Sequence, residues 1–334
     1  MKKLILHIGF NKTGSTSIQQ NLALNADRLR DRGILYPYDP AAPYTQRWQH
    51  VPLAAALPGN RIGWLSPKKA KTKKAAWDSL SRVLAASACD TLILSSEGFG
   101  GMTMKEPQIR WLQERFSGYD ITVINYIRRQ DDYLLSAYQQ RIKAGGTARF
   151  DFKMHETMPS LRFDQRVAPW RKAFGAEKVI VRPFAPELWP KGDLFADFLQ
   201  AAGLDRAGLE RAEPANEGLD HRAVELLRQL NSLNKKPKQR RKAYLDLAAG
   251  LDGLQPADFK KQKMTLSSAQ AETLRRHYRE SNEAALAGTG ISADDLFPPV
   301  PQGRKACLPP QKLPTRLLLN LISGLALAAL KTQS

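Results

Sequence analysis

Residues 7–17 read HIGFNKTGSTS, which places two glycines, several hydroxyl side chains and one lysine at a spacing that suits phosphate binding. A Walker-type phosphate loop reads G-x-x-x-x-G-K-[ST], with its lysine directly after the second glycine. Here Gly9 and Gly14 keep that spacing, Ser15 stands at the lysine position, and Lys12 precedes Gly14 by two residues. A lysine is therefore available to an anion, but it comes from the other arm of the turn.

The elements around this loop are those that phosphate binding requires. The apolar run KLILHIG (3–9) predicts a buried strand, and the apolar spacing within 14–33 predicts a helix that ends at a glycine. Between a strand and a helix, backbone N–H groups and the helix N-terminus both face the anion. The residues that we expect to hold a phosphate are Lys12, Thr13, Gly14, Ser15, Thr16 and Ser17.

A second phosphate-binding pair is predicted in NYIRRQDDYLLSAY. Arg128 ends a predicted strand at 121–127, and Ser136 follows eight residues later on a predicted helix. An arginine fork binds a phosphate at two points, and a serine two helical turns along can donate to the same group. Two alternatives stay open at this stage: Arg129 could take the role, or Arg128 could pair with an aspartate of the helix, such as Asp131.

A candidate general base, Glu97, ends the predicted strand DTLILSSEGF (90–99). The carboxyl ends of strands in an open parallel sheet border the ligand crevice, so Glu97 should face the crevice that Gly14 and Arg128 also border. The alternatives are a carboxylate that caps the next helix and a Walker-B-like acid. His7 lies inside the first strand, and we expect a structural role for it.

These motifs resemble those of sulfotransferases that use 3′-phosphoadenosine 5′-phosphosulfate (PAPS). KTGSTS resembles the family's 5′-phosphosulfate loop, and Arg128 with Ser136 matches its arginine–serine pair for the 3′-phosphate. Carbohydrate- and tyrosine-directed members use a glutamate near the place of Glu97. The resemblance covers roughly residues 3–230. The sequence departs from the family pattern within GFNKTGSTS, and it lacks a clear Arg-Lys-Gly segment late in the chain. The residues of the C-terminal half that would contact the adenine and the 3′-phosphate therefore stay undetermined.

The resemblance implies an enzyme, a PAPS-dependent sulfotransferase with PAPS as donor and no obligatory metal. Lys12 would stabilise the leaving group of an in-line transfer, and Glu97 would take the proton of the acceptor hydroxyl. The expected acceptor is a carbohydrate-type molecule, such as a glycan or glycolipid, or another compound with a hydroxyl group. One alternative is a P-loop kinase or NTPase, which requires a lysine after Gly14. The other is a non-catalytic binder of an anionic polymer or nucleic acid.

The composition indicates a large folded domain and favours a negatively charged partner. The chain has 334 residues, 43% of them hydrophobic, and 51 Lys and Arg against 32 Asp and Glu give a formal charge of +19. The excess favours anionic ligands. The lysine-rich runs lack interleaved aromatic residues, so nucleic acid is not an expected partner.

The order of predicted elements indicates an α/β fold. We predict a P-loop-type, mostly parallel β-sheet flanked by helices on both faces, with a helical C-terminal region. The predicted organisation is a sulfotransferase-like domain at 1–215 with an insertion at 37–75, a helical part at 216–297 packing on it, and a linker with an apolar helix at 298–334.

The sequence also bears on location. Cys89 and Cys307 are far apart, which fits a reducing compartment, and the histidines have no metal-ligand spacing. The apolar stretch 317–330 is short for a membrane span of about 20 residues. We expect a cytoplasmic protein, whose stretch 317–330 either docks on the protein itself or makes a peripheral contact with the inner membrane face.

Overall fold

The computed structural model describes residues 1–60, 62, 73–102, 104–213, 218–233, 236, 262–313 and 315. They divide into two compact units that interleave along the chain. The first unit comprises Met1–Arg129, Pro159–Ala215 and Tyr278–Pro298, and the second comprises Gln130–Met158, Asn216–His277 and Pro299–Ser334. The consecutive limits predicted at 215 and 297 stay predictions.

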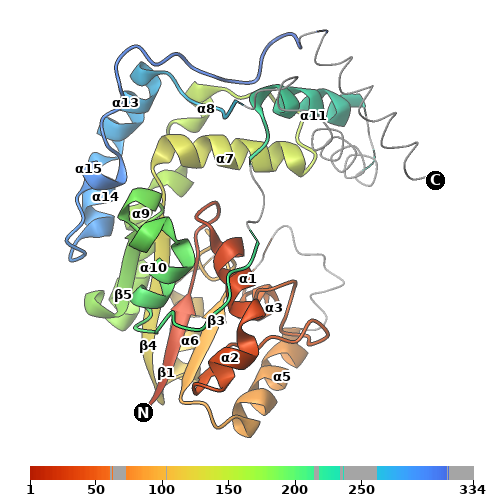
Figure 1. Cartoon of the computed structure of the whole chain (residues 1–334), viewed down its shortest axis with the longest axis vertical. Coiled ribbons are helices and arrows are strands. Elements are labelled where there is room, and N and C mark those ends of the chain that lie inside the picture. Colours follow the sequence, from red (N-terminus) through yellow and green to blue (C-terminus); the bar gives the residue numbers. More distant parts are fainter. Residues whose placement is uncertain are drawn as a thin grey trace. The chain divides into compact units, whose positions relative to one another are not determined.

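The first unit is built on a five-stranded sheet in which all the pairs are parallel, in the order β2-β3-β1-β4-β5. Figure 1 shows β3, β1, β4 and β5 side by side. The strands are β1 (Lys2–His7), β2 (Ile34–Leu35), β3 (Thr91–Ser95), β4 (Tyr119–Ile127) and β5 (Val179–Pro183). This confirms the predicted parallel α/β sheet. The short edge strand β2 was not expected, because two residues carry no periodic signal.

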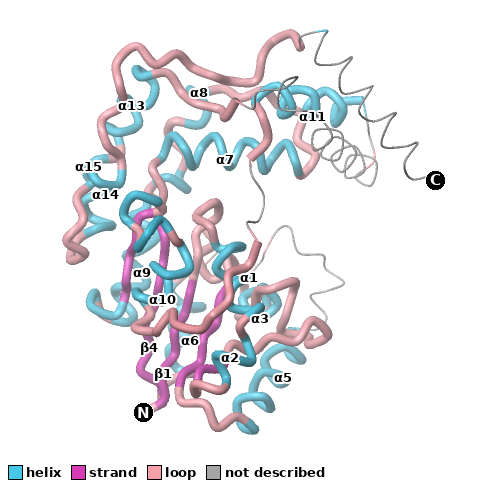
Figure 2. The backbone as a smooth tube through the Cα atoms, viewed as in Figure 1, coloured by secondary structure: helices cyan, strands magenta, loops and turns pink. Residues whose placement is uncertain are grey.

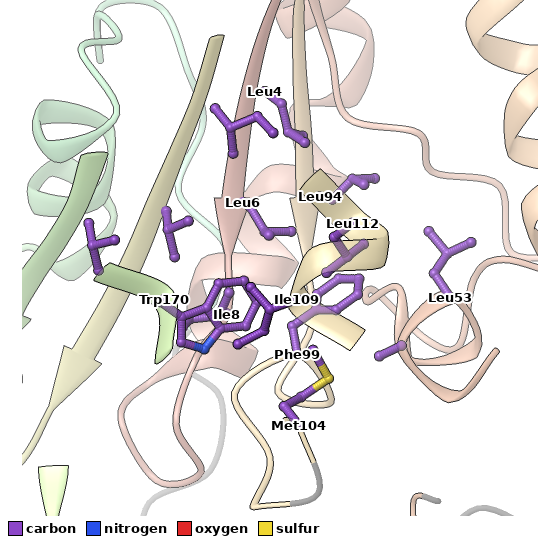
Figure 3. Close-up of a cluster of buried hydrophobic side chains, with 14 of the residues drawn as sticks. Leu4, Leu6, Ile8, Leu53, Leu94, Phe99, Met104, Ile109, Leu112 and Trp170 are labelled. Carbon is purple, nitrogen blue, oxygen red and sulfur yellow. The ribbon is translucent and has the colours of Figure 1, made fainter. Parts of the chain in front are cut away.

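Both faces of this sheet are buried, which explains why its strands read as continuous apolar runs. Leu4 and Leu6 of β1 enter one apolar cluster, whereas Ile5 enters the cluster on the opposite face. Figure 3 shows the first cluster, in which Leu6 lies near Leu94 and Ile8 lies near Trp170. The central strands therefore form the rigid base on which the loops at their carboxyl ends stand.

Helices cover both faces of the sheet, as predicted. The first cluster is covered by α3 (Val51–Ala55), α5 (Lys73–Ala86), α6 (Glu106–Arg115), α9 (Phe163–Phe174) and α14 (Arg279–Leu286). The opposite cluster is covered by α1 (Ser15–Leu24), α2 (Ala26–Arg30) and α10 (Leu194–Ala201). The remaining short elements of this unit are α15 (Ala293–Leu296) and the 3₁₀ turns η1 (Pro159–Leu161), η2 (Ala176–Lys178), η3 (Pro186–Leu188) and η4 (Pro190–Gly192).

Two predicted helices are each broken in two. The helix expected at 14–33 breaks at Asn25, whose side chain bonds the backbone of Glu210 through both its nitrogen, at 3.0 Å, and its oxygen, at 2.7 Å. The sequence LSSAQAETLRRHYRESNEAAL (266–286) also predicts one helix, and this helix breaks at Tyr278, which is buried and directly precedes α14. Both breaks depend on contacts made by residues distant in sequence, or on burial, so the local pattern could not predict them.

The second unit is helical, which confirms the predicted helical C-terminal region. It contains α7 (Gln130–Lys143), α8 (Phe152–His155), α11 (His221–Leu233) and α13 (Ser268–His277), and both α11 and α13 pack on α7 (Figure 2). Asn231 of α11 is buried and donates to the carbonyls of Ile142 and Gly146 at the end of α7. Residues 61 and 63–72 of the insertion predicted at 37–75, and the apolar stretch 317–330, lie outside the described residues. Among the helices that the structure describes, none is long and apolar enough to cross a membrane.

A buried ion pair fixes α10 to the sheet. Asp197 is fully buried, accepts from Arg182 Nε at 3.0 Å at each carboxylate oxygen, and lies 3.2 Å from the Tyr126 hydroxyl. Asp197→Ala removes one charge and leaves the other half-buried, so we expect a loss of about 3–5 kcal/mol in the free energy of unfolding. Urea denaturation measures it. Glu187→Ala, at an exposed position, is the matched control and should stay within about 0.5 kcal/mol of the parent; equal losses would contradict the role of the pair.

Candidate functional site

The loop between β1 and α1 is held in a conformation that few residues adopt. Lys12 has a φ of 69° and Gly14 a φ of 77°, both in the left-handed region, which is uncommon for a lysine. A Cβ on Gly14 would lie 2.4 Å from Leu194 Cδ2 and 2.6 Å from Phe184 Cε2, so only glycine fits there. Gly14 also begins α1 without a side-chain cap, and the first turn of α1 holds no acidic residue. The start of this helix is thus electrostatically suited to an anion.

The hydroxyl side chains of the loop divide into inward and outward groups. Thr13 is fully buried and donates to the carbonyl of Phe10, and Ser15 is only 1% exposed. Thr16 is exposed and Ser17 is half-buried. The Ser15 hydroxyl lies 2.4 Å from where a Cβ on Gly9 would stand, so position 15 is packed beneath the loop. Position 15 therefore holds a small, buried side chain in this conformation.

Arg128 meets the loop at Lys12. It directly follows β4, the neighbour of β1, and its Nη1 donates to the Lys12 carbonyl at 3.2 Å. The guanidinium lies 5.1 Å from the centroid of the Phe184 ring, which also packs against Gly14. The structure thus brings the two predicted cations to one loop.

Glu97 shares this site and is coupled to Lys12. It stands two residues beyond β3, on the other side of β1 from β4. Burial raises the pKa of the Glu97 carboxyl, although the Lys12 ammonium and the Ser15 hydroxyl oppose that rise. Burial also lowers the pKa of Lys12, and the Arg128 charge adds to this effect while Glu97 opposes it. Such opposed shifts in one site are typical of acid–base chemistry.

The remaining candidates from the sequence either belong to the second unit or have other partners. Ser136 lies on α7, in the second unit, and its role stays a prediction. The Arg129 guanidinium lies over the Phe297 ring, 4.6 Å from its centroid. Asp131 accepts from Arg304 at 3.5 Å. In the described parts of the chain, no three His, Cys, Asp or Glu side chains gather as metal ligands.

Sequence reasoning missed two residues that support the site, Gly100 and Arg166. A Cβ on Gly100 would lie 2.2 Å from the Ile8 carbonyl oxygen, so the turn after Glu97 rests directly on the backbone of the loop. Arg166 of α9 donates to the Gly100 carbonyl at 3.0 Å and stacks over the Phe10 ring at 3.4 Å. The glycines that follow Glu97 were a signal for such a close approach, whereas Arg166 carries no local signal.

Two buried histidines adjoin the ends of β1 and β3. His7 Nδ1 lies 2.8 Å from the Ser95 hydroxyl, and His50 Nδ1 accepts from the Ser95 N–H at 3.0 Å. Burial lowers the pKa of His7 to about 3 and that of His50 to about 4. Both rings are therefore neutral at pH 7 and act there as hydrogen-bonding groups of the core.

Comparison with known proteins adds little to this geometry. No family model matches the sequence. An uncharacterized protein of Archaeoglobus fulgidus is 32% identical over 156 residues, which are 45% of this chain and 41% of that protein, so the chain spans less than half of that relative's length. A sulfotransferase from Alicyclobacillus acidocaldarius is structurally similar with a TM-score of 0.40 and 12% identity, over 73% of this chain and 95% of that one. The site residues are therefore the main evidence about function.

The contact of Gly100 with the loop can be tested by one methyl group. In Gly100→Ala, the added Cβ meets backbone oxygen that cannot move without shifting the loop. We expect a loss of about 1–3 kcal/mol in the free energy of unfolding, measured by urea denaturation. Gly118→Ala is the control, because a Cβ there meets nothing within 4 Å. If both variants are equally stable, the turn does not rest on the loop.

Proposed function

We propose that this protein is a PAPS-dependent sulfotransferase that transfers a sulfuryl group to a hydroxyl of a carbohydrate-type acceptor. The observation that carries the proposal is the meeting of Lys12, Arg128 and Glu97 at the loop that begins α1. Two cations at an uncapped helix start suit a donor that carries several negative charges. One carboxylate beside them suits the removal of a proton from an acceptor.

The reaction needs few groups beyond these. The acceptor oxygen forms a new bond to sulfur, while the bond between sulfur and the 5′-phosphate oxygen breaks and leaves its electron pair on that phosphate. Negative charge therefore grows on the former bridging oxygen, and the Lys12 ammonium is the group that we assign to neutralise it. A preorganised donor at such a position commonly contributes about 3 kcal/mol to the stability of a transition state.

Glu97 is the group that we assign to take the acceptor proton. The raised pKa of its carboxyl makes it a stronger base than an exposed glutamate once it is ionised, and the Lys12 charge favours that ionised form. Arg128 is the group that we assign to the donor's 3′-phosphate. Its bond to the Lys12 carbonyl connects the two donor-binding cations directly.

The packing of Ser15 disfavours the alternative of a P-loop kinase or NTPase. Those enzymes place a lysine at this position, where it reaches the terminal phosphates. Here the position is buried beneath Gly9 and accepts a side chain of serine size. Lys12 therefore supplies the positive charge in a different way, from before Gly14.

Calorimetry with adenosine 3′,5′-bisphosphate tests the donor assignment without knowledge of the acceptor. We expect micromolar affinity in the presence of EDTA, weakened about 10–100-fold in Lys12→Ala and in Arg128→Ala, because each loses a charge-assisted contact. Lys153→Ala, an exposed lysine, is the control. Glu97→Gln should retain the affinity while its sulfuryl transfer falls by about 10²–10⁴. Binding that requires Mg²⁺, or that survives loss of Lys12, would count against the proposal.

The pH dependence of the same binding tests the coupling between Lys12 and Glu97. Burial lowers the pKa of the Lys12 ammonium below its ordinary value of 10.5. The affinity for the bisphosphate should therefore begin to fall at a pH below 10.5, where Lys12 loses its proton. Because the Glu97 carboxylate raises the pKa of Lys12, Glu97→Gln should move the decline to lower pH. Lys12→Arg should move it above pH 11, since a guanidinium keeps its proton. Titrations of the three proteins between pH 7 and pH 11 measure this, and identical curves would refute the coupling.

A further inference from the structure

A buried hydrogen bond joins α1 to the end of β3. Gln19, in the second turn of α1, is only 2% exposed, and its Nε2 donates to the Ser95 hydroxyl at 3.1 Å. Ser95 is fully buried, is the last residue of β3 and precedes Glu97 by two residues. Because α1 begins at the loop to which we assign the donor, this bond connects the donor-binding helix to the strand that leads to the proposed base.

The Ser95 hydroxyl continues this connection into β1. Gln19 can only donate through its Nε2, so the Ser95 oxygen accepts and its own hydrogen stays available. His7 Nδ1 lies 2.8 Å from that oxygen, and the ring is neutral at pH 7 because burial lowers its pKa to about 3. The His7 Cε1 lies 3.4 Å from where a Cβ on Gly9 would stand. Side chains of α1, β3 and β1 are thus hydrogen-bonded together beneath the loop between β1 and α1.

The main chain of Ser95 is held by a different segment. The His50 N–H donates to the Ser95 carbonyl at 2.9 Å, and the Ser95 N–H donates to His50 Nδ1 at 3.0 Å. These bonds fix the end of β3 to the chain that follows β2, but they do not reach α1. The bond from Gln19 therefore adds a restraint between α1 and β3 that these bonds do not supply.

The spacing of residues on α1 matches the spacing at the end of β3. Ser15 and Gln19 are four residues apart, so they lie on one face of the helix. Glu97 and Ser95 are two residues apart in the chain that leaves β3. The Ser15 hydroxyl opposes the rise in the pKa of the Glu97 carboxyl, while Gln19 bonds Ser95. One face of α1 therefore meets both the proposed base and the residue that anchors it.

We propose that Gln19 is a positioning residue of the sulfuryl transfer, because its bond to Ser95 fixes the Glu97 carboxyl relative to the start of α1. This inference rests on the proposed function. Gln19 is buried within the protein, so it acts through Ser95 and not by contact with the donor or the acceptor. An in-line transfer depends on the geometry of donor, acceptor and base together, so a base that moves relative to the donor loses efficiency.

The pKa of the Lys12 ammonium in the free protein reports the position of Glu97. Burial and the Arg128 charge lower this pKa, and the Glu97 carboxylate raises it. If the positioning bond is lost, the effect of Glu97 should weaken and the pKa of Lys12 should fall. General loosening of the fold would instead admit water to Lys12 and raise its pKa. The positioning role and a merely structural role therefore predict shifts of opposite sign.

Competitive acetylation with acetic anhydride, read by mass spectrometry between pH 7 and pH 11, measures the pKa of Lys12 separately from the other lysines. We expect Gln19→Met, which keeps the side-chain length and removes the donor, to lower this pKa by less than Glu97→Gln does. Ser95→Ala removes the same bond from its other partner and should lower the pKa as well. Gln19→Met should add no further drop to Glu97→Gln, because both changes remove one interaction.

Gln20→Met is the matched control. It makes the same substitution at the next residue of α1, which is half-buried and has no bond to Ser95 in the described chain. This variant should leave the pKa of Lys12 as it is in the parent. Circular dichroism checks that each variant is folded, and the two variants on opposite sides of the bond keep the test decisive if one of them does not fold.

Two outcomes would overturn the positioning role. The first is a pKa of Lys12 that is unchanged or higher in Gln19→Met and Ser95→Ala. The second is an equal drop in Gln20→Met. The labelling uses neither donor nor acceptor, so its result does not depend on whether the protein binds adenosine 3′,5′-bisphosphate. Failure of the parent to bind that bisphosphate would contradict the donor assignment instead.

Discussion

Two positive charges held at one half-buried loop are the constraint on which the site depends. Lys12 and Arg128 repel each other, burial disfavours the ammonium, and the lysine backbone adopts a left-handed conformation. Each of these terms is unfavourable in the free protein, and an anion at the start of α1 relieves the electrostatic ones. Glu97 relieves them in part, which explains why its carboxylate supports the charge on Lys12. These terms are the physical basis on which we propose that the site binds a polyanion.

The scaffold is able to hold such a site because the surrounding contacts are close and mostly main chain. Gly100 rests on the Ile8 carbonyl, Gly14 packs on Phe184, and Arg166 joins the turn after Glu97 to the ring of Phe10. Beneath them lies a parallel sheet buried on both faces. Because these contacts leave little room for movement, the loop cannot relax its strained residue by shifting away from the neighbouring strands.

The sequence predicted what depends on local pattern and missed what depends on burial. The central strands were recognisable because both of their faces are apolar, and the site residues because charged groups directly follow those strands. The breaks at Asn25 and Tyr278 were not predictable, since a helix pattern continues through both and tertiary contacts end it. Residues 61, 63–72 and 317–330 lie outside the described part of the chain, so the structure does not test the predictions made for them.

The position of Lys12 before Gly14 determines how the protein groups that we assign to the two ends of the donor are connected. In Walker-type loops the lysine follows the second glycine, which here would place it on the first turn of α1. Lys12 instead lies where its carbonyl accepts from Arg128, so one hydrogen bond connects the two cations that we assign to the donor. In the function that we propose, a shift of the guanidinium toward one phosphate would act on the backbone that orients the ammonium at the other. That coupling would favour a ligand with two separate anionic groups over one with a single chain of phosphates.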